Sequence, residues 1–86
     1  MEFRISQHAS IEMSRRGIGR DSVMSVLEKP QQIVAGKAGR KIYQSQLEFG
    51  DGGVYLVRVV LDDQKIPPVV ITVYRTSKLT KYWRGP

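Results

Sequence analysis

The sequence lacks cysteine altogether and has a single histidine, His8, among its 86 residues. Without cysteine, neither a disulfide framework nor a thiolate metal site can form, and small secreted domains usually depend on such cross-links. One histidine and scattered carboxylates give no ligand spacing typical of zinc, although Asp62 and Asp63 in a turn could hold a hard cation loosely. We therefore expect a protein of the reducing cytoplasm that uses no metal and no cofactor.

Long hydrophobic runs are also missing, because the apolar stretches are only as long as strands. The first residues, MEFRIS, do not place a basic segment before an apolar run, which argues against a signal peptide, and nothing is long enough to span a membrane. No internal repeat, low-complexity segment or linker is visible. The length fits one small domain over residues 1–86 with a single core.

Negative charge is scarce. Fourteen Lys and Arg face eight Asp and Glu, which gives a net charge of +6 and a sequence pI near 10.0. On a domain of this size such a field attracts polyanions, namely RNA, DNA or an acidic protein. The alternative is that the protein is basic without binding a polyanion. Net charge therefore suggests a class of partner but does not identify the function.

The order of local patterns predicts two helices followed by strands. Ser6 is a suitable cap for a helix over 7–16 that ends at Gly17, and a second helix begins at Gly19 and stops near Lys29, before Pro30. From Ile33 onward the apolar period is two. Strands are expected over 40–49, 53–63 and 69–76, with a fourth at the edge over 31–35. The tail over 77–83 fits a final helical turn or a docked coil.

These elements predict an α+β fold in which two N-terminal helices pack on one face of a three- to four-stranded antiparallel meander sheet. Strand alternation turns the uniformly apolar faces toward the helices. The opposite, partly open face then carries Arg40, Gln44, Arg58, Thr72 and Tyr74. Guanidinium groups bind phosphate bidentately and an aromatic ring can stack on a base, so this face suits RNA. Alternatively, Arg58 is a solvated strand residue whose stem covers apolar neighbours.

A stripe on the first helix joins His8, Glu12 and Arg15, at spacings of four and three, with Arg16 beside Glu12. Metal-independent RNA cleavage needs such groups: one removes the proton of the 2′-hydroxyl, another protonates the leaving oxygen, and a cation stabilises the charged phosphorane. The stripe is equally compatible with a solvated helix surface.

The runs HASIEMSRRGIGRDSVMSVLEKP, GRKIYQ, YLVRVVLDD and VVITVYRTSKLTKYW resemble a family of small bacterial domains of unknown function. That family looks like a relative of the RelE and BrnT ribonuclease toxins of toxin-antitoxin systems. The resemblance covers nearly the whole chain and implies a RelE-like fold. It also implies metal-independent endoribonuclease activity, with RNA, including ribosome-bound mRNA, as substrate and an acidic antitoxin-like protein as partner.

The residue patterns and the resemblance together suggest a set of site residues, of which His8, Arg16, Arg40, Arg58 and Tyr74 match the polar pattern of the family. The catalytic candidates are His8, Arg16, Arg58 and Tyr74. The candidates for RNA binding are Arg15, Arg40, Lys41 and Arg75. Glu12, Lys41 and Tyr74 are the alternatives for the second proton-transfer group. Two further hypotheses remain: a non-catalytic RNA-binding module of the same fold, and a degenerate member with only a protein-interaction role.

Overall fold

The structure is a computed structural model that describes residues 1–85. Along the chain the elements are β1 (Arg4–Ile5), α1 (Gln7–Arg15), α2 (Arg20–Glu28), β2 (Gln32–Ala35), a 3-10 turn η1 (Lys37–Gly39), β3 (Lys41–Glu48), β4 (Val54–Asp62), β5 (Val69–Thr76) and α3 (Leu79–Tyr82). The α+β class is confirmed. The tail forms one helical turn and then continues as extended chain.

The five strands form one mixed sheet in the order β1-β5-β4-β3-β2. Strands β2 to β5 pair antiparallel with their successive neighbours, whereas β1 runs parallel to β5. The prediction of a purely antiparallel sheet of three to four strands is therefore wrong. Strand β1 has two residues, too few for a period-two pattern, and is held by Arg4 N–H donating to Pro68 O at 2.9 Å.

Helix α1 begins and ends as its sequence predicts. The Ser6 hydroxyl accepts a hydrogen bond from Ala9 N–H at 3.0 Å and donates one to Ile71 O at 3.1 Å, so the cap also ties the helix to β5. Gly17 follows the helix with φ of 65°, the left-handed conformation that glycine adopts without strain. Helix α2 begins after Gly19, which provides no side-chain cap, and ends before Pro30.

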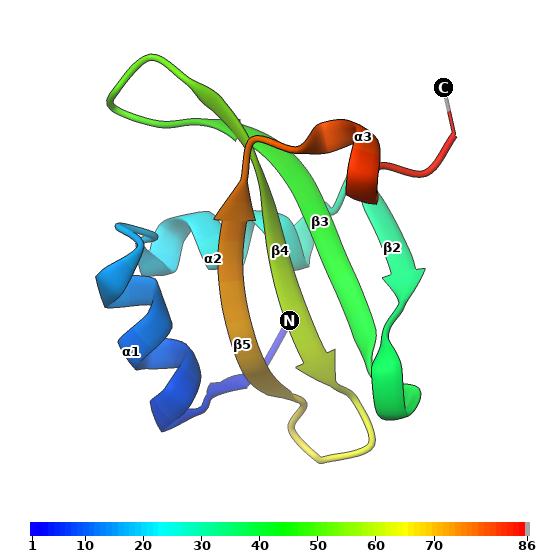
Figure 1. Cartoon of the computed structure of the whole chain (residues 1–86). Coiled ribbons are helices and arrows are strands. Elements are labelled where there is room, and N and C mark those ends of the chain that lie inside the picture. Colours follow the sequence, from blue (N-terminus) through cyan, green and yellow to red (C-terminus); the bar gives the residue numbers. More distant parts are fainter. Residues whose placement is uncertain (86) are drawn as a thin grey trace.

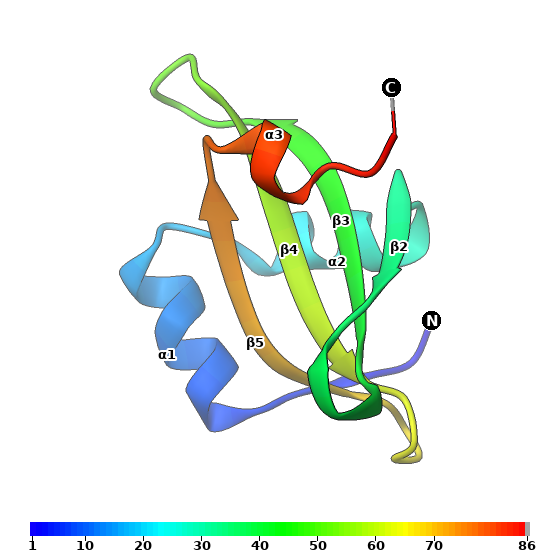
Figure 2. The same cartoon turned by 45° about the vertical axis from the view of Figure 1, so that its right-hand side comes forward.

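The hydrophobic core lies between the sheet and the first two helices. Helix α1 runs beside β5, and α2 crosses one face of the sheet (Figures 1 and 2). Helices α1 and α2, the turn between them and strands β4 and β5 contribute the buried side chains Ala9, Met13, Ile18, Val23, Val26, Leu27, Val57, Val59, Leu61, Val70 and Val73. The predicted apolar face of β4 is therefore the one that meets the helices. On β5 strict alternation places Val70 on the opposite face from Val73, and this is wrong, because an irregularity in the β4–β5 pairing between Val60 and Leu61 brings Val70 into the core as well.

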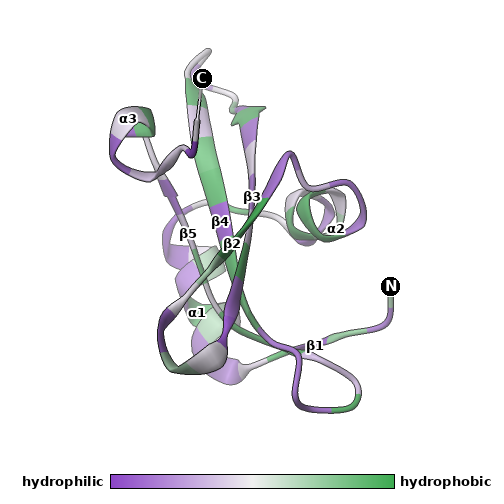
Figure 3. Cartoon of the chain, turned by 90° about the vertical axis from the view of Figure 1, so that its right-hand side faces the viewer, coloured by the Kyte–Doolittle hydropathy of each residue, from purple (hydrophilic) through white to green (hydrophobic). Residues whose placement is uncertain are grey.

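The opposite face of the sheet differs from the expectation. Figure 3 shows α3 on one side of the sheet and α2 on the other. Beneath α3, Leu56 and Gln44 have no exposed surface and Arg58 is 7% exposed. The centre of the face that was expected to be partly open is thus closed. The reason is that the tail folds back over it, which strand alternation alone cannot reveal.

Candidate nucleic-acid interface

Four polar side chains form a row across the covered face. Gln32 pairs with Gln44, Gln44 with Arg58, and Arg58 with Tyr74, each in register on neighbouring strands. Residues directly opposite each other on one face have their side chains in contact range. The register therefore brings together Arg58 and Tyr74, two of the predicted catalytic residues, and adds two glutamines.

Arg58 is held in place on several sides. Its Nε donates to Gln44 Oε1 at 2.8 Å, and its Nη1 donates to the Tyr74 hydroxyl. The guanidinium carbon lies 4.2 Å from the centre of the Tyr82 ring, a cation–π contact. Within residues 1–85 no carboxylate forms an ion pair with Arg58. The site thus holds a nearly buried cation without a counter-ion, which is costly unless hydrogen bonds and ring contacts offset the lost hydration.

The glutamines fasten the C-terminal segment over this row. Gln44 Nε2 donates to Gln32 Oε1 at 2.8 Å and to Tyr82 O at 3.2 Å. Gln32 in turn accepts from Arg84 N–H at 3.1 Å and donates to Arg84 O. We call residues 79–85 the C-terminal cover. Because the cover occupies the face above Arg58, a phosphate group cannot lie flat on this arginine in the structure as it stands.

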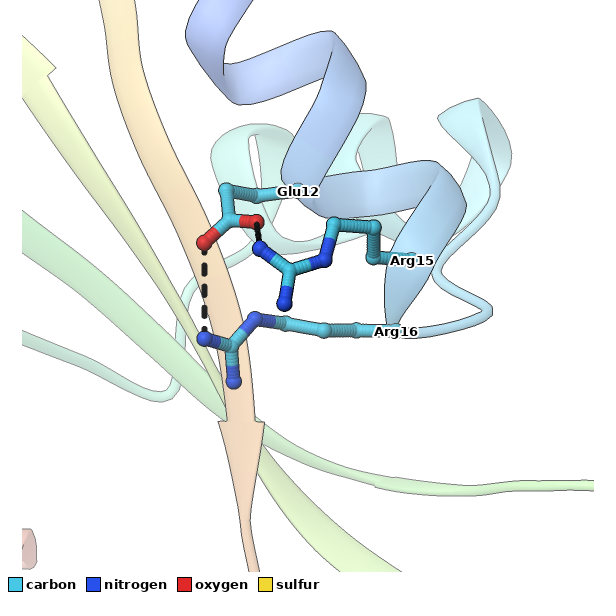
Figure 4. Close-up of polar contacts among 3 residues, drawn as sticks. All are labelled: Glu12, Arg15 and Arg16. Carbon is cyan, nitrogen blue, oxygen red and sulfur yellow. Dashed lines mark hydrogen bonds and ion pairs between the residues drawn. The ribbon is translucent and has the colours of Figure 1, made fainter.

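The α1 stripe joins one half-buried carboxylate, Glu12, to exposed basic side chains, and it is partly ion-paired (Figure 4). Arg15 Nη1 lies 2.9 Å from Glu12 Oε2, and Arg16 Nη2 lies 3.5 Å from Glu12 Oε1. The side chain of Arg15 is 72% exposed and that of Arg16 is 42% exposed. One carboxylate therefore orients two guanidinium groups that remain accessible to solvent.

His8 lies in the first turn of α1 and is exposed. Among the residues that the structure describes, its side chain takes part in no hydrogen bond. The predicted catalytic set is thus divided. His8 and Arg16 lie on the helix, whereas Arg58 and Tyr74 lie beneath the C-terminal cover, and none of the hydrogen bonds within 1–85 joins the two groups.

Arg75, a predicted RNA contact, stacks on two aromatic rings. Its guanidinium carbon lies 4.1 Å from the Phe49 ring centre and 4.5 Å from that of Tyr55. The Tyr55 hydroxyl donates to Asp51 Oδ2 at 2.9 Å, and Gly53 N–H donates to Asp51 Oδ1 at 2.8 Å. These bonds, first that from Gly53 and then that from Tyr55, lower the pKa of Asp51, and the nearby Arg75 lowers it further. The ring contacts hold Arg75 in a defined orientation.

Arg40 and Lys41 lie at the other end of the sheet. Lys41 Nζ pairs with Asp63 Oδ2 at 2.8 Å. This hydrogen bond raises the pKa of Lys41 and lowers the pKa of Asp63. Arg40 precedes β3 and is half-buried, and its carbonyl accepts from Gly36 N–H at 2.8 Å. Neither residue contacts the α1 stripe or the Arg58 row through a hydrogen bond within the described chain.

Six of the fourteen Lys and Arg residues lie on or next to elements at one end of the sheet. The C-terminal ends of α1 and β5 and the whole of α3 lie at this end, whereas η1 and the start of β3 lie at the other (Figures 1 and 2). We define the basic end by Arg15, Arg16, Arg75, Lys78, Lys81 and Arg84. Of these six, only Arg15 and Arg16 have a carboxylate partner within 1–85, and they share Glu12.

Sequence reasoning missed the role of three residues at this site. Gln44 was placed on the correct face, but its bonds to both Arg58 and the cover were not foreseen. Gln32 and Tyr82 were not identified at all. Gln32 could be found only from the register in which the edge strand pairs with its neighbour, and the sequence of the run over 31–35 does not determine that register. No sequence signal marks Tyr82, because its contact with Arg58 spans distant parts of the chain.

Within residues 1–85, no group of three or more His, Cys, Asp or Glu side chains is arranged to hold a metal ion. No helix in that range is both long and apolar enough to cross a bilayer.

Comparison with known proteins gives one match. No curated protein and no solved structure matches the chain. The model of one protein family, DUF4258, a domain of unknown function, matches residues 5–75. This range contains the helices α1 and α2, strands β2 to β4 and most of β5, as well as Gln32, Gln44, Arg58 and Tyr74, whereas the C-terminal cover lies outside it. Since the match spans most of the 86 residues, the chain belongs to the DUF4258 family.

Proposed function

We propose that this domain binds single-stranded RNA through the basic end of the sheet. The observation that carries the proposal is that six cationic side chains lie at this end, and that among residues 1–85 only Arg15 and Arg16 of these six have an ion-paired carboxylate, which they share. Glu48 and Asp51 also lie at this end, so the net charge of its side chains is positive but moderate. Unpaired cations at one end attract a phosphate chain and release its counter-ions on binding.

The geometry of the arginines supports this proposal. Arg75 is fixed against Phe49 and Tyr55, so little side-chain entropy is lost when its N–H groups bind phosphate. Arg15 and Arg16 are oriented by Glu12 and remain exposed. Guanidinium groups arranged in this way recognise phosphate oxygens by charge-assisted hydrogen bonds. Recognition of this kind follows the backbone and does not require a base sequence.

The test is the salt dependence of binding to a short fluorescein-labelled oligouridine, measured by fluorescence anisotropy. The double variant Arg75→Gln, Lys81→Gln removes two cations from the basic end, and the control Lys37→Gln, Lys65→Gln removes two from the other end. We expect the first to bind about tenfold more weakly and its log–log salt slope to fall by about 0.7 for each lost contact. Equal losses in the two double variants contradict the proposal, because they indicate attraction by net charge alone.

A second candidate function is metal-independent endoribonuclease activity of the RelE and BrnT type, in a cytoplasmic toxin-antitoxin system. The observation that favours it is the Arg58–Tyr74 pair, a guanidinium bonded to a tyrosine hydroxyl that forms no ion pair with a carboxylate of residues 1–85. In this proposal Arg58 and Arg16 stabilise the phosphorane, His8 transfers a proton, and Tyr74 is the second proton-transfer group. An acidic antitoxin-like protein neutralises the basic end.

This second candidate requires a rearrangement, because the cover lies on Arg58 and His8 lies on α1. The experiment is incubation of a mixed-sequence RNA, and separately of translating ribosomes, with the protein in EDTA. Cleavage that is lost in both His8→Ala and Tyr74→Phe supports the ribonuclease. Absence of cleavage with either substrate contradicts it, and the RNA-binding proposal is unaffected by that outcome.

A further inference from the structure

A groove separate from the basic end lies on the helix side of the sheet. Residues from β1 and the chain before it, from α1 and from the start of α2 line it, and its volume is about 590 Å³. The lining residues are Phe3, Arg4, Ile5, Ser10, Met13 and Arg20. The N-terminal segment and α2 lie on the same side of the sheet in Figure 3. The groove therefore uses none of the residues of the basic end or of the Arg58 row.

The groove combines an apolar floor with a cationic rim. Phe3 and Ile5 are half-buried and Met13 is 8% exposed, and all three pack with the core. Arg4 and Arg20 are exposed, and the Arg20 guanidinium carbon lies 5.4 Å from the Phe3 ring centre. Within residues 1–85 neither arginine forms an ion pair with a carboxylate.

From this arrangement we propose that the groove binds a short acidic segment of a partner protein, which carries one aliphatic or aromatic side chain. The apolar side chain lies on Phe3 and Met13, where the flexible thioether adapts to its shape. Carboxylates on the segment pair with Arg4 and Arg20. Charge complementarity selects this occupant, because both rim cations lack a carboxylate within the described chain and the whole domain carries +6.

An RNA strand fits this site less well than it fits the basic end. The floor offers aliphatic and thioether groups together with a single aromatic ring, that of Phe3. Single-stranded RNA binding relies on free aromatic faces for base stacking. The two rim arginines provide too few cations to follow a phosphate chain.

The experiment is a selection of random peptides displayed on phage against the whole protein. The variant Ser10→Trp serves as counter-selection, since Ser10 is exposed on α1 at the groove and an indole there fills it without a change of charge. We expect the enriched peptides to be acidic with one large apolar residue. They should bind wild type in anisotropy measurements and lose at least tenfold in affinity with Ser10→Trp and with Arg4→Gln, Arg20→Gln.

The control is the Lys37→Gln, Lys65→Gln protein, which has the same charge as the double arginine variant and should bind these peptides like wild type. Neutral or basic enriched peptides, equal binding to Ser10→Trp, or no enrichment of peptides on wild type over Ser10→Trp each overturn the proposal. Oligouridine binding should be unchanged in Ser10→Trp, so failure of this proposal is distinguishable from failure of the RNA-binding proposal. Displacement of the peptides by oligouridine assigns the groove to RNA and also overturns it.

Discussion

Replacement of Gln44 by methionine is the most direct perturbation of the polar row. Gln44 has no exposed surface, accepts a charge-assisted hydrogen bond from Arg58 Nε and donates to Gln32 and Tyr82. Methionine has a similar volume, so the packing changes little while all three bonds are lost. Arg58 Nε is then left without its acceptor in a nearly dry environment.

The magnitude follows from the kinds of bond. A hydrogen bond to a charged group contributes about 1.5–3 kcal/mol, and a neutral one about 0.5–1.5 kcal/mol. Gln32 keeps its hydrogen bonds with Arg84, and Tyr82 O can accept a hydrogen bond from water instead. The loss of each neutral hydrogen bond should therefore cost a free energy near the lower limit of its range. We expect Gln44→Met to lower the free energy of unfolding by about 2–4 kcal/mol, out of a total of about 4–13 kcal/mol for a chain of this length.

Urea unfolding followed by far-UV circular dichroism measures this loss. Trp83, the only tryptophan, lies in the C-terminal cover, so its fluorescence reports on the cover separately. We expect the fluorescence of Gln44→Met to shift to the red before the sheet unfolds. The control is Gln46→Met on the same strand, because the Gln46 side chain forms no hydrogen bond within 1–85. If both variants unfold within about 0.5 kcal/mol of each other, the reasoning is refuted.

Three other predictions concern the termini of elements and the surface ion pairs. Gly17→Ala should lower the free energy of unfolding by about 1 kcal/mol, because φ is 65° at this position. A Cβ at Gly17 or at Gly50 has no atom within 4 Å, but φ is not positive at Gly50. Gly50→Ala should therefore have little effect in the same urea titration. The pKa of Asp51 is lowered on folding, so the ionised carboxylate stabilises the folded protein above the unfolded pKa of 3.8, and this stabilisation is lost as the pH falls through the lower folded pKa. Asp51→Asn should therefore weaken the decrease of the melting temperature at acidic pH in thermal melts. Lys41→Met should lower the free energy of unfolding only slightly, because the pair with Asp63 is exposed, and this small loss should vanish at about 1 M NaCl. A loss that survives high salt indicates a packing role.

The helices could be predicted because their signals are local. Ser6 accepts the Ala9 N–H as its position implies, and Gly17 has the positive φ that ends α1. The run before Pro30 ends α2 for a steric reason that is readable in sequence. The three long strands likewise follow from their period of two.

Contacts between distant segments could not be predicted in this way. Strand β1 depends on Arg4 reaching Pro68 across the whole chain, and two residues carry no period. The cover depends on Tyr82 and Arg84 meeting Gln44 and Gln32, and no spacing rule links a tail to a sheet face. The candidate site was consequently only half predicted: Arg58 and Tyr74 share a face, but the covering of that face was missed.

The chemistry of the covered row bears on the choice between the two proposed functions. A sheet face covered by a helical turn can be closed with apolar side chains, which are often as stabilising as a buried charge or more so. Arg58 instead keeps a cation there that is ion-paired with no carboxylate of the described chain. The row lies within the range matched by the family, whereas the cover does not. Stability alone therefore gives no reason for an arginine at this position. Binding of an anion to Arg58 when the cover opens would be such a reason. The RNA cleavage assay should therefore be carried out beside the assay of RNA binding at the basic end.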